Sequence, residues 1–173
     1  NKGIKIQVQD ETICNDLINM GITPRKTCKL NIDKIVEMLS SDENLLRNFI
    51  RGIVDGDGHI SYSPNDKCGK YYTFDVSGSE DVVRAVRDVF SKYCKTPYDK
   101  KVLNNCDNGH RVTYSAERDV KSICEWLYSN IDYRFVHLRK LCAVVSLDEN
   151  LKNEFNKKFK DFSDRTFSPL SAL

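Results

Sequence analysis

The stretch that most constrains the fold is the run at positions 49–58, Phe-Ile-Arg-Gly-Ile-Val-Asp-Gly-Asp-Gly. Apolar residues lead into it and through it with the spacing of one helix face, at positions 45, 46, 49, 50 and 53. Asp42 is a good helix N-cap. The pattern therefore predicts a helix from Asp42 to about Val54 that is closed by Gly56 and Gly58.

One glycine lies inside this predicted helix, and two acids lie at its end. Gly52 costs about 1 kcal/mol relative to alanine in a helix interior, and close approach of a second helix is the usual reason for keeping it. Asp55 and Asp57 fall at the helix C-terminus, where the helix dipole is negative. Anions are unfavourable there, whereas a hard divalent cation is favoured by carboxylate and carbonyl oxygens. The alternative is an ordinary helix followed by an Asp-Gly turn into a hairpin.

Composition narrows the class of protein. The chain has 173 residues, which is enough for one domain, or one domain and part of another. Its net charge of +2 argues against a uniformly basic surface, but it leaves room for one basic face. No apolar run approaches the roughly 20 residues that span a bilayer, so we expect no membrane partner.

The seven cysteines are widely and irregularly spaced and include no Cys-x-x-Cys pair, which argues against a zinc site. An odd number of scattered cysteines is typical of a protein from a reducing, intracellular compartment. Four of them fall in apolar helical patterns and are expected to be buried thiols, at Cys14, Cys94, Cys124 and Cys142.

Periodicity gives the order of the remaining elements. Before the motif, we expect a strand over 4–9, a helix ending at Gly21, a basic loop over 23–29 and a short helical connection over 31–41. After the motif, we expect strands over 58–63 and 70–77, a helix capped by Ser77 or Ser79, strands over 98–103 and 110–115, a helix around 120–128 and a last helix from Val136. The chain is therefore α+β, with four strands in one antiparallel sheet that has helices on one face and a free opposite face.

The motif at residues 50–58, together with the order α-β-β-α-β-β-α over residues 42–147, resembles one repeat of the LAGLIDADG homing endonuclease family. The resemblance implies a site-specific endonuclease that hydrolyses double-stranded DNA with Mg²⁺ or another divalent cation. It also implies that the free face of the sheet is a saddle that lies in the DNA major groove.

Residues 1–41 look like the tail of a preceding repeat, because their strand, helix and basic loop resemble those over 110–141. They are alternatively an extension of a single-repeat protein. Residues 148–173 are expected to be a C-terminal helix or tail. Cutting both DNA strands needs two active sites, so the resemblance implies a second repeat, supplied by a homodimer partner or by a part of the protein that precedes this sequence.

The resemblance also assigns residues to the active site. Asp57 matches the metal-binding aspartate, the carbonyl of Gly56 matches the backbone oxygen beside it, and Asp55 ranks second. A basic residue before the last helix should assist catalysis, and either Arg139 or Lys140 fits. The seam between two motif helices would form at Gly52, with Ile53 and Ile50 nearby.

Residues that contact DNA should alternate along the free face of the sheet and continue into its turns, and arginine, lysine and asparagine are suited to base edges. The candidates on the first hairpin are Ser61, Ser63, Asn65, Lys67, Tyr71, Thr73 and Asp75. Those on the second hairpin are Lys100, Asn104, Asn105, His110, Arg111 and Thr113. The basic loop adds Arg25, Lys26 and Lys29.

Three other interpretations remain open. The first is a nucleic-acid-binding protein with this fold that does not cleave, such as an intron maturase or a transcription regulator. The second is the endonuclease part of an intein, although positions 167–173 lack the His-Asn ending that intein splicing uses. The third is an α/β interaction domain without enzyme activity, which leaves the Gly52 and Asp-Gly-Asp-Gly pattern without a role.

Overall fold

The computed structural model describes residues 7, 9–22, 30–65, 69–104, 109–128, 140, 143, 144 and 153, apart from the side chains of 63–65, 69, 70 and 104. The strand expected over 4–9, the basic loop over 23–29 and the tail from 148 lie wholly or largely outside these residues. Most of the last helix also lies outside them, although Lys140, Ala143 and Val144 are helical.

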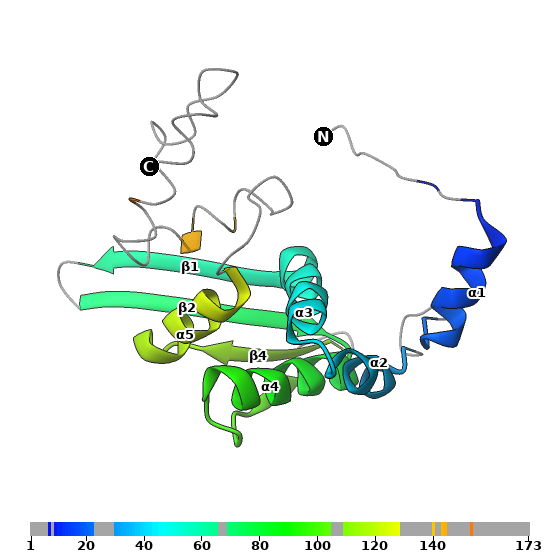
Figure 1. The fold of residues 1–173 in the computed structure, drawn as a ribbon. Helices are drawn as coiled ribbons and strands as arrows, with labels where there is room; N and C mark the ends of the chain where they lie inside the picture. The colour runs from blue at the N-terminus through cyan, green and yellow to red at the C-terminus, as the bar shows by residue number, and fades with distance from the viewer. Residues whose placement is uncertain are drawn as a thin grey trace.

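The described elements follow the predicted order from the motif helix onward (Figure 1). The helices are α1 (Glu11–Asn19), α2 (Ile32–Leu39), α3 (Glu43–Asp57), α4 (Glu80–Cys94) and α5 (Glu117–Tyr128). The strands are β1 (Gly58–Asn65), β2 (Gly69–Gly78), β3 (Val102–Asn104) and β4 (His110–Tyr114).

The four strands form one antiparallel sheet in the order β1-β2-β4-β3, which confirms the predicted α+β class and sheet type. The two hairpins meet through β2 and β4, where Phe74 is opposite Tyr114. β3 is shorter than the strand expected over 98–103. Lys100 N–H donates to the Pro97 carbonyl at 3.4 Å, so the chain is still turning there and pairing begins only at Val102.

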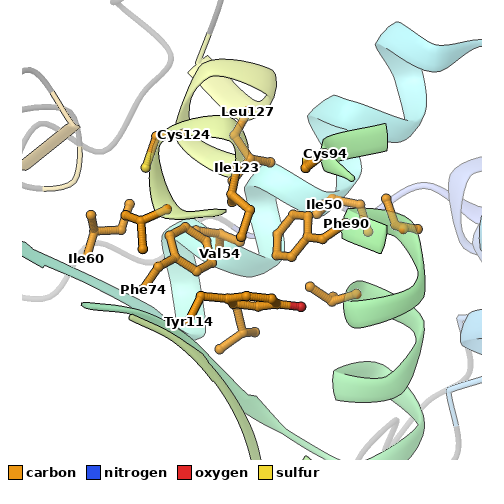
Figure 2. Packing of buried hydrophobic residues seen from close by; sticks show 14 of the residues in the cluster. Ile50, Val54, Ile60, Phe74, Phe90, Cys94, Tyr114, Ile123, Cys124 and Leu127 are labelled. Carbon is orange, nitrogen blue, oxygen red and sulfur yellow. The ribbon is translucent and has the colours of Figure 1, made fainter. Parts of the chain in front are cut away.

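A core of apolar side chains fills the space between the sheet and helices α3, α4 and α5 (Figure 2). The aromatic rings of Phe74, Phe90 and Tyr114 pack edge to face, with centroids 5.6–6.4 Å apart. Ile50 from α3 and Ile123 from α5 are fully buried in the same cluster. Burial of this face on every element is what fixes the orientation of the motif helix against the sheet.

Helix α3 begins where predicted and ends later. The Asp42 side chain accepts hydrogen bonds from the backbone N–H groups of Asn44 (2.8 Å) and Leu45 (3.2 Å), which confirms the N-cap. The helix runs to Asp57, so Gly56 lies within it rather than ending it. Gly58 has an ordinary φ of −91°, and close packing explains why it is glycine. A Cβ atom there would lie 2.6 Å from the Val54 carbonyl oxygen.

The two helices before the motif differ in how they are held. In α2, Ile32 and Ile35 are each only 1% exposed, so this helix is packed into the body that follows it. Helix α1 has no buried residue and carries Cys14 exposed, which corrects the expectation that Cys14 is a buried thiol. Cys94 and Cys124 are buried as predicted, and burial raises the pKa of the Cys94 thiol to about 12.

Among the described residues, no helix is both long enough and apolar enough to cross a membrane. Cys142 lies outside the described residues.

Candidate functional site

The end of α3 presents the acidic part of the motif at the surface. Gly56 and Asp57 are exposed, Asp55 is half-buried, and Val54 is fully buried beneath them. No group of three histidine, cysteine or acidic side chains that could hold a metal exists among the described residues. The oxygen donors at the end of α3 are the carboxylates of Asp55 and Asp57 and the carbonyl of Gly56, and oxygen ligands of this kind are the type that Mg²⁺ and Ca²⁺ accept.

Asp55 is held by a tyrosine from α5. The Tyr128 hydroxyl donates a hydrogen bond to Asp55 Oδ1 at 2.9 Å, and Tyr128 itself is only 4% exposed. Burial and then the neighbouring Asp55 charge raise the pKa of Tyr128 well above its ordinary value, so the hydroxyl keeps its proton and remains a donor. Asp55 thus has a protein partner, whereas Asp57 is exposed.

A buried lysine closes the end of the motif helix. Lys140 is 3% exposed, and its Nζ donates to the Val54 carbonyl at 2.6 Å and also to the Gly58 carbonyl. The ammonium therefore lies at the negative end of the helix dipole, in the same turn as Asp57. The structure places Lys140 beside the motif, as expected for one of the two alternatives. Arg139 lies outside the described residues.

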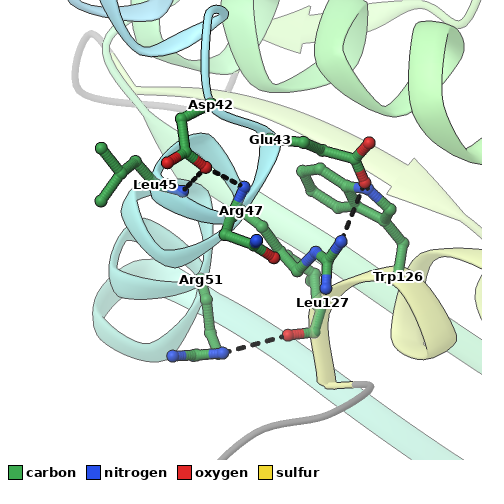
Figure 3. A network of polar contacts seen from close by, with 8 residues as sticks. Asp42, Glu43, Leu45, Arg47, Arg51, Trp126 and Leu127 are labelled. Carbon is green, nitrogen blue, oxygen red and sulfur yellow. Dashed lines mark hydrogen bonds and ion pairs between the residues drawn. The ribbon is translucent and has the colours of Figure 1, made fainter.

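A network of polar contacts fixes the rest of α3 against α5 (Figure 3). Glu43 accepts hydrogen bonds from Arg47 at 2.8 Å and from the Trp126 ring nitrogen at 3.0 Å, and these contacts lower the pKa of Glu43. One turn before the acids, Arg51 donates to the Leu127 carbonyl at 3.3 Å. Sequence reasoning missed Trp126 and this use of Arg51, because an aromatic residue at helical spacing predicts only a core position.

The face of α3 that points away from the core is open. Gly52 and Gly56 are one turn apart on it, and a Cβ atom added to either would meet no atom of the described residues within 4 Å. Ile53 beside them is half-buried. Ile50, by contrast, has no exposed surface and lies in the core, so its assignment to the seam was wrong. A side chain enclosed by its own chain cannot contact a second helix.

The free face of the sheet carries many of the predicted polar residues. Ser61 on β1 is opposite Thr73 on β2, and both are partly exposed. Tyr71 is 58% exposed. Arg111 and Thr113 on β4 share this face, because Val112 between them is buried on the opposite side. The alternation also places Tyr72, Phe74 and Val76 in the core, as predicted.

The structure also reveals an exposed residue that the sequence reasoning passed over. His59 directly follows the motif and lies opposite Asp75, so it occupies the free face next to Asp57. The signal that could have found it was the same alternation that identified Ser61. Asp75 lies on this face too, but it is only 9% exposed and is enclosed by its neighbours.

Two of the predicted DNA contacts belong to the helix-covered side. His110 shares its face with the buried Val112 and Tyr114, and its Nε2 lies 3.4 Å from Glu80 of α4. Lys100 precedes the strand, and its Nζ lies over the ring of the buried Tyr114, 5.5 Å from the centroid. Both assignments were wrong. His110 alternates with Arg111 and Thr113 along β4 and so takes the opposite face, and Lys100 lies before β3, which begins only at Val102.

The remaining candidates are described only in part or not at all. Asn104 is opposite His110 in the register, and Ser63 and Asn65 lie in β1, but only their backbones are described. The residues outside the described part are Lys67, Asn105, Arg25, Lys26 and Lys29.

No family model and no curated protein matches the chain. The solved structures that it resembles include several homing endonucleases. I-CvuI, in a complex with uncleaved DNA at 2 mM Mg, is 16% identical over 64% of this chain and 68% of that chain, with a TM-score of 0.43. The group I intron-encoded I-CeuI, complexed with DNA, is 15% identical over 90% of this chain and 80% of that chain, with a TM-score of 0.47.

The LAGLIDADG meganuclease I-AabMI, bound to uncleaved DNA, is 18% identical over 65% of this chain and 38% of that chain, with a TM-score of 0.43. At these identities and TM-scores, the fold assignment rests on the element order and strand order of the chain itself.

Proposed function

We propose that this chain is one half of a metal-dependent, site-specific double-stranded DNA endonuclease of the homing type. The observation that carries the proposal is the end of α3, where Gly56 and Asp57 are exposed next to an open glycine face and the free face of the sheet. Helix formation alone does not explain two acids at a helix end beside a face on which the glycines contact none of the described residues.

In this proposal the Asp57 carboxylate and the Gly56 carbonyl hold a divalent cation. When bound, such a cation supplies activation of water and neutralisation of the scissile phosphate. Tyr128 keeps Asp55 in place, and the Lys140 ammonium offsets the negative charge that the helix end would otherwise add around the two aspartates. The free face of the sheet binds the duplex through Ser61, Tyr71, Thr73, Arg111 and Thr113.

The second active site is proposed to come from a second LAGLIDADG repeat. The Gly52 and Gly56 face of α3 would pack against the equivalent face of another motif helix, because the missing side chains let two backbones approach closely. That repeat is either a second copy of this chain or a part of the protein that precedes residues 1–41. The segment over 1–41 is proposed to be the tail of such a preceding repeat or an extension.

The test is to incubate the full chain with Mg²⁺ and a randomised duplex library and to sequence the broken ends. We expect discrete double-strand breaks that Asp57→Asn abolishes while duplex binding in Ca²⁺ persists. Asp81→Asn, an exposed acid in the first turn of α4, is the matched control and should cleave as the parent does.

Equal cleavage by Asp57→Asn would refute the assignment of Asp57 as a metal ligand. Site-specific binding without breaks in Mg²⁺ would favour a non-cleaving maturase or regulator. It would also be the result if the second site lies in a preceding repeat, and addition of that repeat would then restore cleavage.

A further inference from the structure

A row of three side chains crosses the free face of the sheet near the motif. The register places Ser77 of β2 opposite Arg111 of β4, and Arg111 opposite Leu103 of β3. Residues opposite each other in an antiparallel pair project from the same face. Val76 and Val112, which precede and follow members of this row, are fully buried on the other face, so the row itself faces outward.

Arg111 is held in a fixed direction by its neighbours on β2. Its Nε donates to Ser77 Oγ at 3.2 Å and lies 3.8 Å from Asp75 Oδ1. Among the described residues, no hydrogen bond engages its two terminal nitrogens, and 46% of its side chain is exposed. An arginine fixed through Nε presents a planar pair of donors outward, which is the geometry that matches the O6 and N7 acceptors of guanine.

Leu103 is an apolar side chain on an otherwise polar surface. It is 54% exposed and has Arg111 as its cross-strand neighbour. Side chains paired in this way lie about 5 Å apart, and bases in one strand of a duplex rise about 3.4 Å per step. Leu103 and Arg111 can therefore reach neighbouring bases in one groove. The apolar feature that a base offers in the major groove is the 5-methyl group of a pyrimidine.

We infer that Arg111 and Leu103 form a two-base reading unit, in which Arg111 recognises guanine and Leu103 contacts the 5-methyl group of an adjacent pyrimidine. Asp75 and Ser77 are positioning residues that hold Arg111 and do not themselves read DNA. This inference deepens the proposed function and depends on its DNA-binding part, but it does not require cleavage.

The experiment selects duplexes from a randomised library by binding to the full chain in Ca²⁺. The parent should select a guanine with a 5-methyl pyrimidine at the neighbouring step. Arg111→Lys should weaken the preference at the guanine alone, because lysine lacks the planar pair of donors. Leu103→Ala should lose the preference at the pyrimidine alone. Arg84→Lys on α4 and Met38→Ala on α2 are matched exposed controls and should leave the selected site unchanged.

Single-atom changes in the selected duplex sharpen the result. Replacing the guanine with 7-deazaguanine should weaken parent binding about tenfold and Arg111→Lys binding much less. The methyl group can be removed by changing thymine to uracil or 5-methylcytosine to cytosine. For whichever of these bases the parent selects, the removal should weaken binding by the parent about fourfold. Leu103→Ala should not respond to that removal. The responsive base identifies the source of the methyl group.

Asp75→Asn supplies the readout for the positioning role. We expect a weaker guanine preference with an unchanged pyrimidine preference, because a neutral amide no longer attracts the guanidinium. If Arg111→Lys weakens all duplexes equally, Arg111 contacts phosphate and the inference is overturned. If neither methyl removal affects the parent, Leu103 reads no methyl group and the inference is overturned. If the chain selects no duplex at all, both the proposed function and this inference are overturned.

Discussion

The two faces of α3 are built from one fifteen-residue helix and have opposite properties. On the inner face, Leu46, Ile50 and Val54 have no exposed surface and contact the sheet and the other helices. On the outer face, Gly52 and Gly56 have no neighbour in the described part of the chain within 4 Å of where a Cβ atom would lie. The inner face is completed by this chain, whereas the outer face leaves room, among the described residues, for the close approach of a second helix.

The inner face of α3 contributes to the stability of the chain, whereas the outer face is proposed to contribute to its assembly. Apolar burial on the inner face contributes to folding of the chain in isolation. A glycine on the outer face costs the isolated helix free energy, which only a close helix partner would offset. Substitutions on the two faces should therefore have effects of different size and even of opposite sign.

The largest effect is expected on the inner face. Ile50→Ala should lower the free energy of unfolding by about 2–5 kcal/mol, because it leaves a cavity in a fully enclosed site. Ile53→Ala, the same change on the half-buried flank of the outer face, should cost only about 1 kcal/mol. Denaturant unfolding of the two variants measures both values. Equal losses would mean that the two faces do not differ as the structure indicates.

An intermediate effect is expected where the helix meets α5. Tyr128→Phe removes the hydrogen bond to Asp55 and should lower the free energy of unfolding by about 1–2 kcal/mol, since a buried hydroxyl bonded to a carboxylate is lost. Tyr98→Phe is the matched control, because Tyr98 is 68% exposed, and it should change stability little. Thermal unfolding compares the stability of the two variants. If Tyr128→Phe is as stable as the parent, the hydroxyl does not hold Asp55.

The smallest effect is expected on the outer face, with the opposite sign. Gly52→Ala should raise the free energy of unfolding of the isolated chain by up to about 1 kcal/mol, because alanine is the better helix residue and has room there. Gly58→Ala should instead destabilise it, because the new Cβ would meet the Val54 carbonyl at 2.6 Å. Denaturant unfolding measures both changes, and a loss of stability in Gly52→Ala would show that this face is not open.

The same position tests the seam. Gly52→Leu should leave the fold intact while lowering the mass of the DNA-bound assembly, since the larger side chain separates two motif helices. Light scattering of the complex measures this change. An unchanged mass would place the seam on another surface.

Much of the fold could be predicted from local patterns. The N-cap at Asp42, the helix that follows it, the two hairpins and the faces of β2 all come from residue type and spacing, which act within a few residues along the chain. The face of His110 also follows from alternation with Arg111 and Thr113, and its assignment to DNA did not apply that rule. The extent of β3 could not be predicted in this way, because it depends on where the turn at Pro97 ends and pairing with β4 begins.

The candidate site divides in the same manner. The motif itself identified Gly52, Gly56 and Asp57, and the structure leaves all three exposed. The partners of the motif come from far along the chain: Tyr128 bonds to Asp55, and Lys140 bonds to the carbonyls at the helix end. Nothing in the spacing of an aromatic residue indicates the Tyr128 contact, and for the basic residue the family resemblance left Arg139 and Lys140 as alternatives. Ile50 shows the reverse error, since a residue next to the seam in sequence lies in the core.

The sequence by itself determined the element order, the place of the acids at a helix end and the faces of the longest strands. These features follow from periodicity and from capping, which are local properties of the chain. Only the tertiary structure decided which side of the motif helix is enclosed, which polar groups hold its end, and that Ser77, Arg111 and Leu103 share one row. Those outcomes depend on long-range pairing and packing. In these contacts, each side chain competes for space and hydrogen bonds with residues that are distant in the sequence.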